Sequence, residues 1–296
     1  MRVATTRLGR RRRRPRPSVT TTATWLRPRI VYALTVVVGA AAFLWPFFVP
    51  AEALPAEAHG ADAPLVAAAI GALVVTAVAL EVRHGTMHAA TVALLGVLAA
   101  SAGLLRLLDL PGGGSGMFFL AVLAGAAFGP RFGLLLGLTA MAVSAVVTGG
   151  IGPWLPFQML ALGWMTAGAG TVGRLTRRWP PRLEVAVLAA YGWVWGLVYG
   201  AIMNLWFWPF VSGTPLSYAP GLAPAEVLQR YLGFYSLTSL GWDAAGALTN
   251  AVLIGLTGRP LLRSMRRFAH RLEPVVELVP AVADGPAGAQ QLASPR

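Results

Sequence analysis

The sequence contains no cysteine and no lysine, and it carries few charged residues of either sign. Without cysteine, disulfides, thiolate metal sites and thiol nucleophiles are excluded. Charged residues make up 12% of the 296 positions, whereas a soluble domain has about 25%. Hydrophobic residues make up 56% of the chain and the mean hydropathy is +0.64. The composition therefore indicates a polytopic membrane protein.

Motifs for catalysis or metal binding are also missing. The four histidines, His59, His84, His88 and His270, form no HExxH zinc motif. There is no GxSxG nucleophile motif, and the segment GPRFGLLLG lacks the lysine of a phosphate-binding loop. We therefore expect a protein that is not an enzyme and holds no metal or cofactor. Any ATP that its function needs would be hydrolysed by another chain.

Long apolar runs recur along the chain. Segments this apolar are expected to be helices, because the bilayer offers no partner for unpaired backbone groups. The predicted fold is thus an all-α integral membrane protein with eight transmembrane helices. Their approximate spans are 30–49, 64–80, 87–108, 117–128, 132–148, 157–175, 183–210 and 231–258.

The distribution of arginine predicts the orientation. All 24 basic residues are arginine and the net charge is +13. If the amino terminus is inside, the outward turns hold one arginine, Arg230, with Arg106 at a nearby span end. The remaining arginines lie on the inward side. The positive-inside rule then places both termini in the cytoplasm and the protein in the plasma or inner membrane. Because topology explains the charge, we expect no nucleic-acid partner.

The two ends of the chain have different composition from the spans. Residues 1–29 are basic and predict a disordered cytoplasmic tail that contacts anionic lipid. Residues 261–296 begin with an amphipathic stretch that is expected to lie along the inner surface, and they end in a disordered tail.

The central segment 129–170 predicts a helical hairpin. Its two apolar runs are separated by TGGIGPWLP, whose glycines and prolines disfavour helix. The turn carries Trp154, and Gln158 follows one helical turn later. An aromatic ring and an amide at the membrane boundary suit an amphipathic small molecule, although tryptophan also anchors helices at this depth. We expect this turn to face outward at the mouth of a solute pocket.

The same segment carries a family resemblance. GPRFG, then SAVVTGGIGPWLPFQ, then a glycine-rich helix resembles the third and fourth transmembrane helices of the substrate-binding S component of energy-coupling factor (ECF) vitamin transporters. It looks most like the uncharacterised and cobalamin-type members. With its flanking helices the resemblance covers 87–258. It implies a six-helix core at 87–260, preceded by two additional helices at 30–86.

The resemblance also implies a function and a pocket. An S component captures a vitamin-like molecule from outside and delivers it inward together with a transmembrane coupling subunit and two ATPase subunits. Its pocket lies in the outer halves of the last helices, and the loop 211–230 is a candidate lid. Carried onto this sequence, the lining residues would be Trp154, Gln158, Asn204, Trp208, Trp242 and Asp243.

A row of small residues marks the span 87–108. Ala89, Ala93, Gly96 and Ala100 fall on one helical face. Small residues in such rows allow helices to approach closely in lipid. By resemblance, this face would contact the coupling subunit, and the alternative is packing against a neighbouring helix of the same chain.

Two alternatives to the importer reading remain open. Asp243 near the middle of the last span costs free energy in lipid unless it faces the interior. It either binds ligand, packs, or serves an ion-coupled secondary transporter. A non-catalytic membrane scaffold is the other class. The sequence does not specify the substrate.

Overall fold

The computed structural model describes residues 28–50, 54, 58–110 and 114–272, and most of them are helical. Four helical stretches are long and apolar enough to cross a membrane: Ile30–Phe48, Ala63–Arg83, Pro130–Thr148 and Pro181–Phe210. Two apolar helices are shorter. The prediction of an all-α membrane protein is confirmed at this level, and the count of eight crossings stays a prediction. Most of the basic segment 1–29 and all of 273–296 lie outside the described residues.

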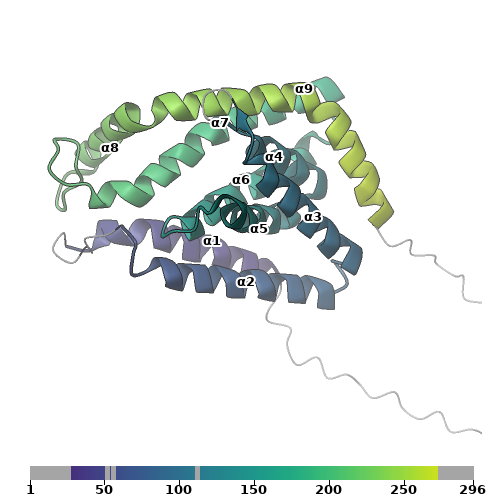
Figure 1. Cartoon of the computed structure of the whole chain (residues 1–296), viewed down its shortest axis with the longest axis horizontal. Coiled ribbons are helices and arrows are strands. Elements are labelled where there is room, and N and C mark those ends of the chain that lie inside the picture. Colours follow the sequence, from purple (N-terminus) through teal and green to yellow (C-terminus); the bar gives the residue numbers. More distant parts are fainter. Residues whose placement is uncertain (1–27, 51–53, 55–57, 111–113, 273–296) are drawn as a thin grey trace, which may run out of the picture.

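Figure 1 shows α1 and α2 side by side along one edge of the molecule, with α7 and α9 together along the opposite edge. A two-residue antiparallel ladder pairs Asp109 with Ser115 and Leu110 with Gly114. The elements are α1 (Pro28–Leu44), η1 (Trp45–Phe48), α2 (Ala63–Arg83), α3 (Ala89–Leu105), β1 (Asp109–Leu110), β2 (Gly114–Ser115), α4 (Gly116–Phe128), α5 (Pro130–Thr148), α6 (Leu155–Thr176), α7 (Pro181–Phe207), η4 (Trp208–Phe210), α8 (Pro224–Thr238) and α9 (Leu240–Leu272).

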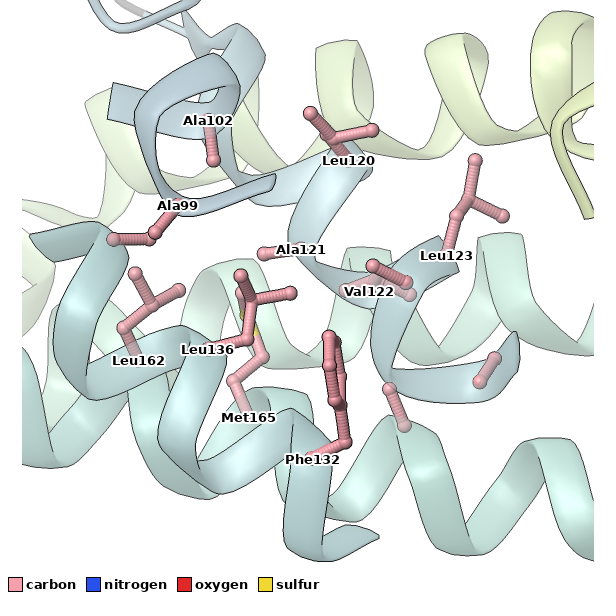
Figure 2. Packing of buried hydrophobic residues seen from close by; sticks show 14 of the residues in the cluster. Ala99, Ala102, Leu120, Ala121, Val122, Leu123, Phe132, Leu136, Leu162 and Met165 are labelled. Atoms are coloured by element: carbon pink, nitrogen blue, oxygen red, sulfur yellow. The ribbon is translucent and has the colours of Figure 1, made fainter. Parts of the chain in front are cut away.

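Helix α4 forms the centre of the core. It has 13 residues and is therefore about 20 Å long, short for a membrane crossing. All residues from Leu120 to Ala126 are buried. Figure 2 shows these side chains meeting those of α3, α5 and α6, including Ala99, Phe132 and Met165. The apolar character of this segment thus reflects burial by neighbouring helices on all sides.

Helices α5 and α6 form the predicted hairpin, and glycine allows them to pack closely. A Cβ added at Gly133 would collide with the Thr166 main-chain carbonyl, and one added at Gly137 would lie 2.6 Å from Gly163. The Thr166 hydroxyl donates to the Gly133 carbonyl at 2.5 Å. The glycines of this segment are therefore required by helix contact, and the predicted spans agree with the helices to within two residues.

The last predicted span differs from the structure. Residues 231–258 were expected to form one helix, but the chain breaks at Ser239 between α8 and α9. The reason is a side-chain interaction: the Asn204 amide donates to the Ser239 hydroxyl at 2.8 Å and accepts from Thr238 at 3.2 Å. The hydroxyls of Thr238 and Ser239 are thus hydrogen-bonded to α7, and Ser239 leaves the helical conformation (φ −133°, ψ −30°).

Helix α9 also differs from expectation at its other end. It continues through Pro260 to Leu272, and Figure 1 shows it turning down along the bundle at its end. Leu262 and Met265 are buried, and Arg266 donates to the Glu184 carboxylate at 2.8 and 2.5 Å. The first part of the predicted surface stretch 261–279 is therefore packed onto α7, and residues after 272 lie outside the described chain.

The two ends of the bundle have opposite character. At one, which we call the arginine end, Arg131, Arg174, Arg177 and Arg266 surround a common cavity. At the other, the aromatic end, rings from η1, the start of α6 and η4 pack together. Helices α1 and α2 join the core through a cluster that includes Phe43, Ile70, Leu138, Phe157 and Leu160.

Candidate functional site

A buried histidine lies at the aromatic end. His59 precedes α2 and its side chain is 0% exposed. Its Nδ1 lies 2.7 Å from Asp62 Oδ2, which also accepts a hydrogen bond from Trp45 Nε1 at 2.8 Å. With the carboxylate ionised, Nδ1 carries the proton and donates it to Asp62. His59 also has a positive φ of 55°, a conformation that is uncommon for residues other than glycine.

Aromatic rings from three other elements enclose His59. Its ring centroid lies 4.4 Å from Phe157 in α6, 4.9 Å from Phe210 in η4 and 5.7 Å from Trp206 near the end of α7. The Trp206 ring is stacked on the imidazole, with an interplanar angle of 21°. The loop between α1 and α2 therefore inserts a polar side chain into rings supplied by the core.

Several polar atoms in this cluster have no partner. His59 Nε2, Asp62 Oδ1 and Trp206 Nε1 are buried without a hydrogen-bond partner among the described residues, as is Trp164 Nε1 nearby. Such groups in native structures are uncommon and call for an explanation. Burial lowers the pKa of His59, whereas the Asp62 carboxylate and, more weakly, the Trp206 backbone oppose that shift. A neutral His59 leaves Nε2 as an acceptor, while Trp206 Nε1 is a donor.

A second group of rings surrounds Trp208, one of the predicted lining residues. Trp208 is 1% exposed and its Nε1 donates to the Leu216 carbonyl at 2.8 Å. The Phe47, Tyr218 and Tyr231 rings lie 6.0, 5.6 and 5.1 Å away. Trp208 thus fixes residues 211–223 of the predicted lid against η1, and the rest of the predicted loop is the start of α8. Tyr218 adds a bond from its hydroxyl to the Phe47 carbonyl at 3.1 Å.

Asn204 and Asp243 lie on the same seam between α7 and the α8–α9 pair. Asn204 is fully engaged with Gly200, Thr238 and Ser239. Asp243 lies against Gly200, where a Cβ would collide with its carboxylate. Asp243 Oδ2 is buried without a partner, and the Tyr235 hydroxyl interacts with this carboxyl group. The seam therefore holds one satisfied amide and one incompletely satisfied acid.

The other predicted lining residues lie at the periphery. Trp154 is 40% exposed, donates to the Gly150 carbonyl at 3.3 Å and contacts the Trp206 ring edge-on at 6.4 Å. Gln158 is half-buried, one turn into α6. Trp242 is 73% exposed on the outside of α9. The structure therefore brings Asn204, Trp208 and Asp243 together along one face of α7. Trp154 lies beside Trp206 on another face of α7, and the exposed Trp242 ring lies apart from both groups.

Large side chains pack behind the Trp154 turn, where Phe157 and Leu160 are fully buried. The open mouth expected at this turn stays a prediction. Among the described residues, a cavity of about 500 Å³ lies at the opposite, arginine end. Sequence reasoning missed His59, Asp62 and Trp206, because their common site is built from segments far apart in the chain.

The small residues of α3 face away from the protein. Ala89, Ala93, Gly96 and Ala100 are all exposed, and a Cβ added at Gly96 would meet nothing within 4 Å. Gly103, further along the same row, is instead in contact with α5, where a Cβ would lie 3.1 Å from the Ser144 nitrogen. The first four residues therefore form an open strip, since no helix in the described part of the chain packs on them.

Within the described part of the chain, no group of three histidine, aspartate or glutamate residues is arranged to hold a metal ion. Comparison with protein-family models, with curated proteins and with solved structures finds no match to this chain. The functional argument therefore depends on the geometry above and on the sequence resemblance.

Proposed function

We propose that this chain is the membrane-embedded substrate-binding subunit of an ECF-type importer, which captures a vitamin-like small molecule at the aromatic end. The observation that carries the proposal is the set of buried, unpartnered polar atoms of His59, Asp62 and Trp206 inside a ring cluster. A bound solute that donates to His59 Nε2 and accepts from Trp206 Nε1 would satisfy them. The resemblance of 87–258 to S components supports the same class.

The arginine distribution supports the orientation that this function requires. The arginine end faces the cytoplasm by the positive-inside rule, so that the aromatic end faces outward. Both termini are then cytoplasmic, and the helices make eight crossings of the plasma or inner membrane. In this arrangement α1 and α2, which lie outside the six-helix core, contribute Trp45, His59 and Asp62 to the solute site.

Solute entry would require the rings to separate. Phe157 and Trp206 come from the core, whereas His59 and Trp45 come from the α1–α2 connection, so the two sets can move apart without unfolding a helix. Trp154 and Gln158 lie at the edge of this cluster and would contact the solute as it enters. Trp208 and Asn204 would act by holding the 211–223 loop and the α8–α9 break in place.

Delivery would depend on other chains. The exposed strip Ala89, Ala93, Gly96 and Ala100 is smooth enough for a close helix–helix contact in lipid, which suits the coupling subunit. Two cytoplasmic ATPase subunits would supply the energy, and this chain itself would catalyse no reaction. Its own contribution is selective binding and docking.

Asp243 favours a second candidate, an ion-coupled secondary transporter. Its Oδ2 atom is buried and unpartnered beside Gly200, and an ionisable group inside a membrane protein is a candidate proton or ion carrier. This function would need no ATPase partner.

Uptake into proteoliposomes separates these functions. Accumulation that requires added coupling and ATPase subunits together with ATP supports the importer. Accumulation by this chain alone that stops when the proton gradient is collapsed supports the secondary transporter and overturns our proposal. If the purified chain retains no small molecule and no uptake occurs with any partner, a non-catalytic scaffold is the better account.

A further inference from the structure

The cavity at the arginine end has an excess of positive charge that topology alone does not require. It measures about 500 Å³, within the usual range for ligand sites. Its basic lining comes from four different elements or turns: His88, Arg131, Arg174, Arg177, Arg266 and His270. The positive-inside rule predicts only that arginines lie on this side of the membrane. It does not explain why several of them line one cavity.

Two of the four arginines are neutralised and two are not. Arg131 pairs with the buried Glu81 carboxylate at 3.2 Å, and Arg266 pairs with Glu184 at 2.5 Å. In the described chain no carboxylate pairs with Arg174 or Arg177. Arg177 instead lies 3.2 Å from His270 Nε2. Among the described residues, at least two positive charges of the cavity thus have no negative partner.

Helix ends add to this positive field. Helices α3 and α5 both begin at the cavity, at His88 and Gly129, and neither has a side-chain cap. The Arg174 guanidinium lies directly against the start of α5, where a Cβ added at Gly129 would be 3.1 Å from Nη2. A helix amino terminus carries a partial positive charge, and a cation beside it is unfavourable. An anion between them would remove that cost.

Part of the cavity lining is apolar. It comes from Ala126, Ala127 and Phe128 at the end of α4 and from Phe132 in α5. A hollow lined by both cations and hydrocarbon, at the cytoplasmic boundary of the bilayer, suits a ligand with a phosphate group attached to an apolar body.

We propose that this cavity binds a phosphate group, and that its ligand is the headgroup of an anionic phospholipid of the inner leaflet. Arg174 and Arg177 would contact the phosphate oxygens, since a guanidinium matches phosphate with paired hydrogen bonds. The first-turn backbone N–H groups of α5 would face the same anion. Glu81 would stay paired with Arg131 and would not contact the ligand. This site is independent of the solute site at the aromatic end.

The test uses the purified full-length chain and native mass spectrometry with phosphatidylglycerol, phosphatidylcholine or inorganic phosphate as the probe. Both lipids carry a phosphate, but the choline cation of phosphatidylcholine offsets its charge, so we expect about tenfold tighter binding of phosphatidylglycerol, which is about 1.4 kcal/mol. The double variant Arg174→Gln, Arg177→Gln should lose this preference. The matched control Arg178→Gln, Arg182→Gln removes the same charge from exposed neighbours outside the cavity lining and should keep it.

Each outcome decides the proposal. If both double variants lose the preference for phosphatidylglycerol equally, general surface charge attracts the lipid and the proposal is overturned. The proposal is also overturned if the native chain shows no preference between the two lipids. Competition by millimolar inorganic phosphate would support the phosphate site but assign it to a soluble ligand. If the Arg174→Gln, Arg177→Gln variant fails to fold, Thr91→Phe tests the proposal in its place, because it adds bulk to the cavity lining without changing the charge. This variant should reduce the preference for phosphatidylglycerol, and an unchanged preference would contradict the site.

Discussion

The Asp62 carboxylate is predicted to be the main polar anchor of the aromatic end. Replacing Asp62 with alanine removes the acceptor for two donors, Trp45 Nε1 at 2.8 Å and His59 Nδ1 at 2.7 Å. A buried donor left unpaired costs about 1–3 kcal/mol, so the two together should cost about 2–6 kcal/mol. At about 2–4 °C per kcal/mol for a large domain, the melting temperature should fall by roughly 4–24 °C.

The assay is thermal unfolding of the purified chain in a fixed detergent, with Glu226→Ala as the matched control. Glu226 pairs with Arg230 at 2.7 Å, but both side chains are substantially exposed, at 45% and 29%. An exposed pair of this kind contributes only about 0–1 kcal/mol, so its removal should shift the melting temperature little.

A double-mutant cycle tests the reasoning further. In a His59→Phe background one of the two donors is absent, and Asp62→Ala should then cost clearly less than in the native chain. If Asp62→Ala shifts the melting temperature no more than Glu226→Ala, or by the same amount in both backgrounds, the buried network does not stabilise the aromatic end as argued here.

Three further changes have expected outcomes. Gly133→Ala should lower the stability of the protein in thermal unfolding by about 1–3 kcal/mol, because the added Cβ would collide with the backbone of α6. Its control, Gly96→Ala, adds a Cβ where nothing lies within 4 Å and should be neutral or slightly stabilising. Equal effects of the two variants would contradict the close packing of α5 on α6. Burial lowers the pKa of His59 in the folded protein, so the stability that neutral His59 contributes is complete above pH about 6.5 and is lost as the pH falls through the pKa of the folded state. In thermal melts at a series of pH values, His59→Gln should reduce the loss of melting temperature on the acid side. An unchanged dependence of melting temperature on pH would refute this role of His59. Ala89→Leu with Ala93→Leu should abolish co-purification with a coupling subunit at unchanged melting temperature, because both residues are exposed; retained co-purification would move the docking face elsewhere.

The hairpin at the centre of the fold could be predicted because its signals are local. The apolar runs, the Gly/Pro turn after residue 148 and the glycine spacing all lie within one continuous segment. The structure agrees with the predicted helix ends there to within two residues. The close packing that Gly133 and Gly137 permit was not predicted, because their contacts with Thr166 and Gly163 appear only in the coordinates.

Other features depend on contacts between distant segments and could not be predicted from local sequence. The break at Ser239 is imposed by Asn204, 35 residues earlier. His59 lies in a polar connection, where a histidine predicts exposure, yet it is buried by rings from α6 and η4. Trp206 and Trp208 are two positions apart at the end of α7, so they point in different directions and join different clusters.

The central claim is that the His59 cluster holds a solute at the outward end of the protein. Native mass spectrometry of the gently purified chain tests it most directly, with His59→Phe as the comparison. We predict a small molecule retained by the native protein and lost, or held at least tenfold more weakly, by the variant, as expected when a specific hydrogen-bonding partner is removed. A native protein that retains nothing, or a small molecule retained equally by both, would contradict the account.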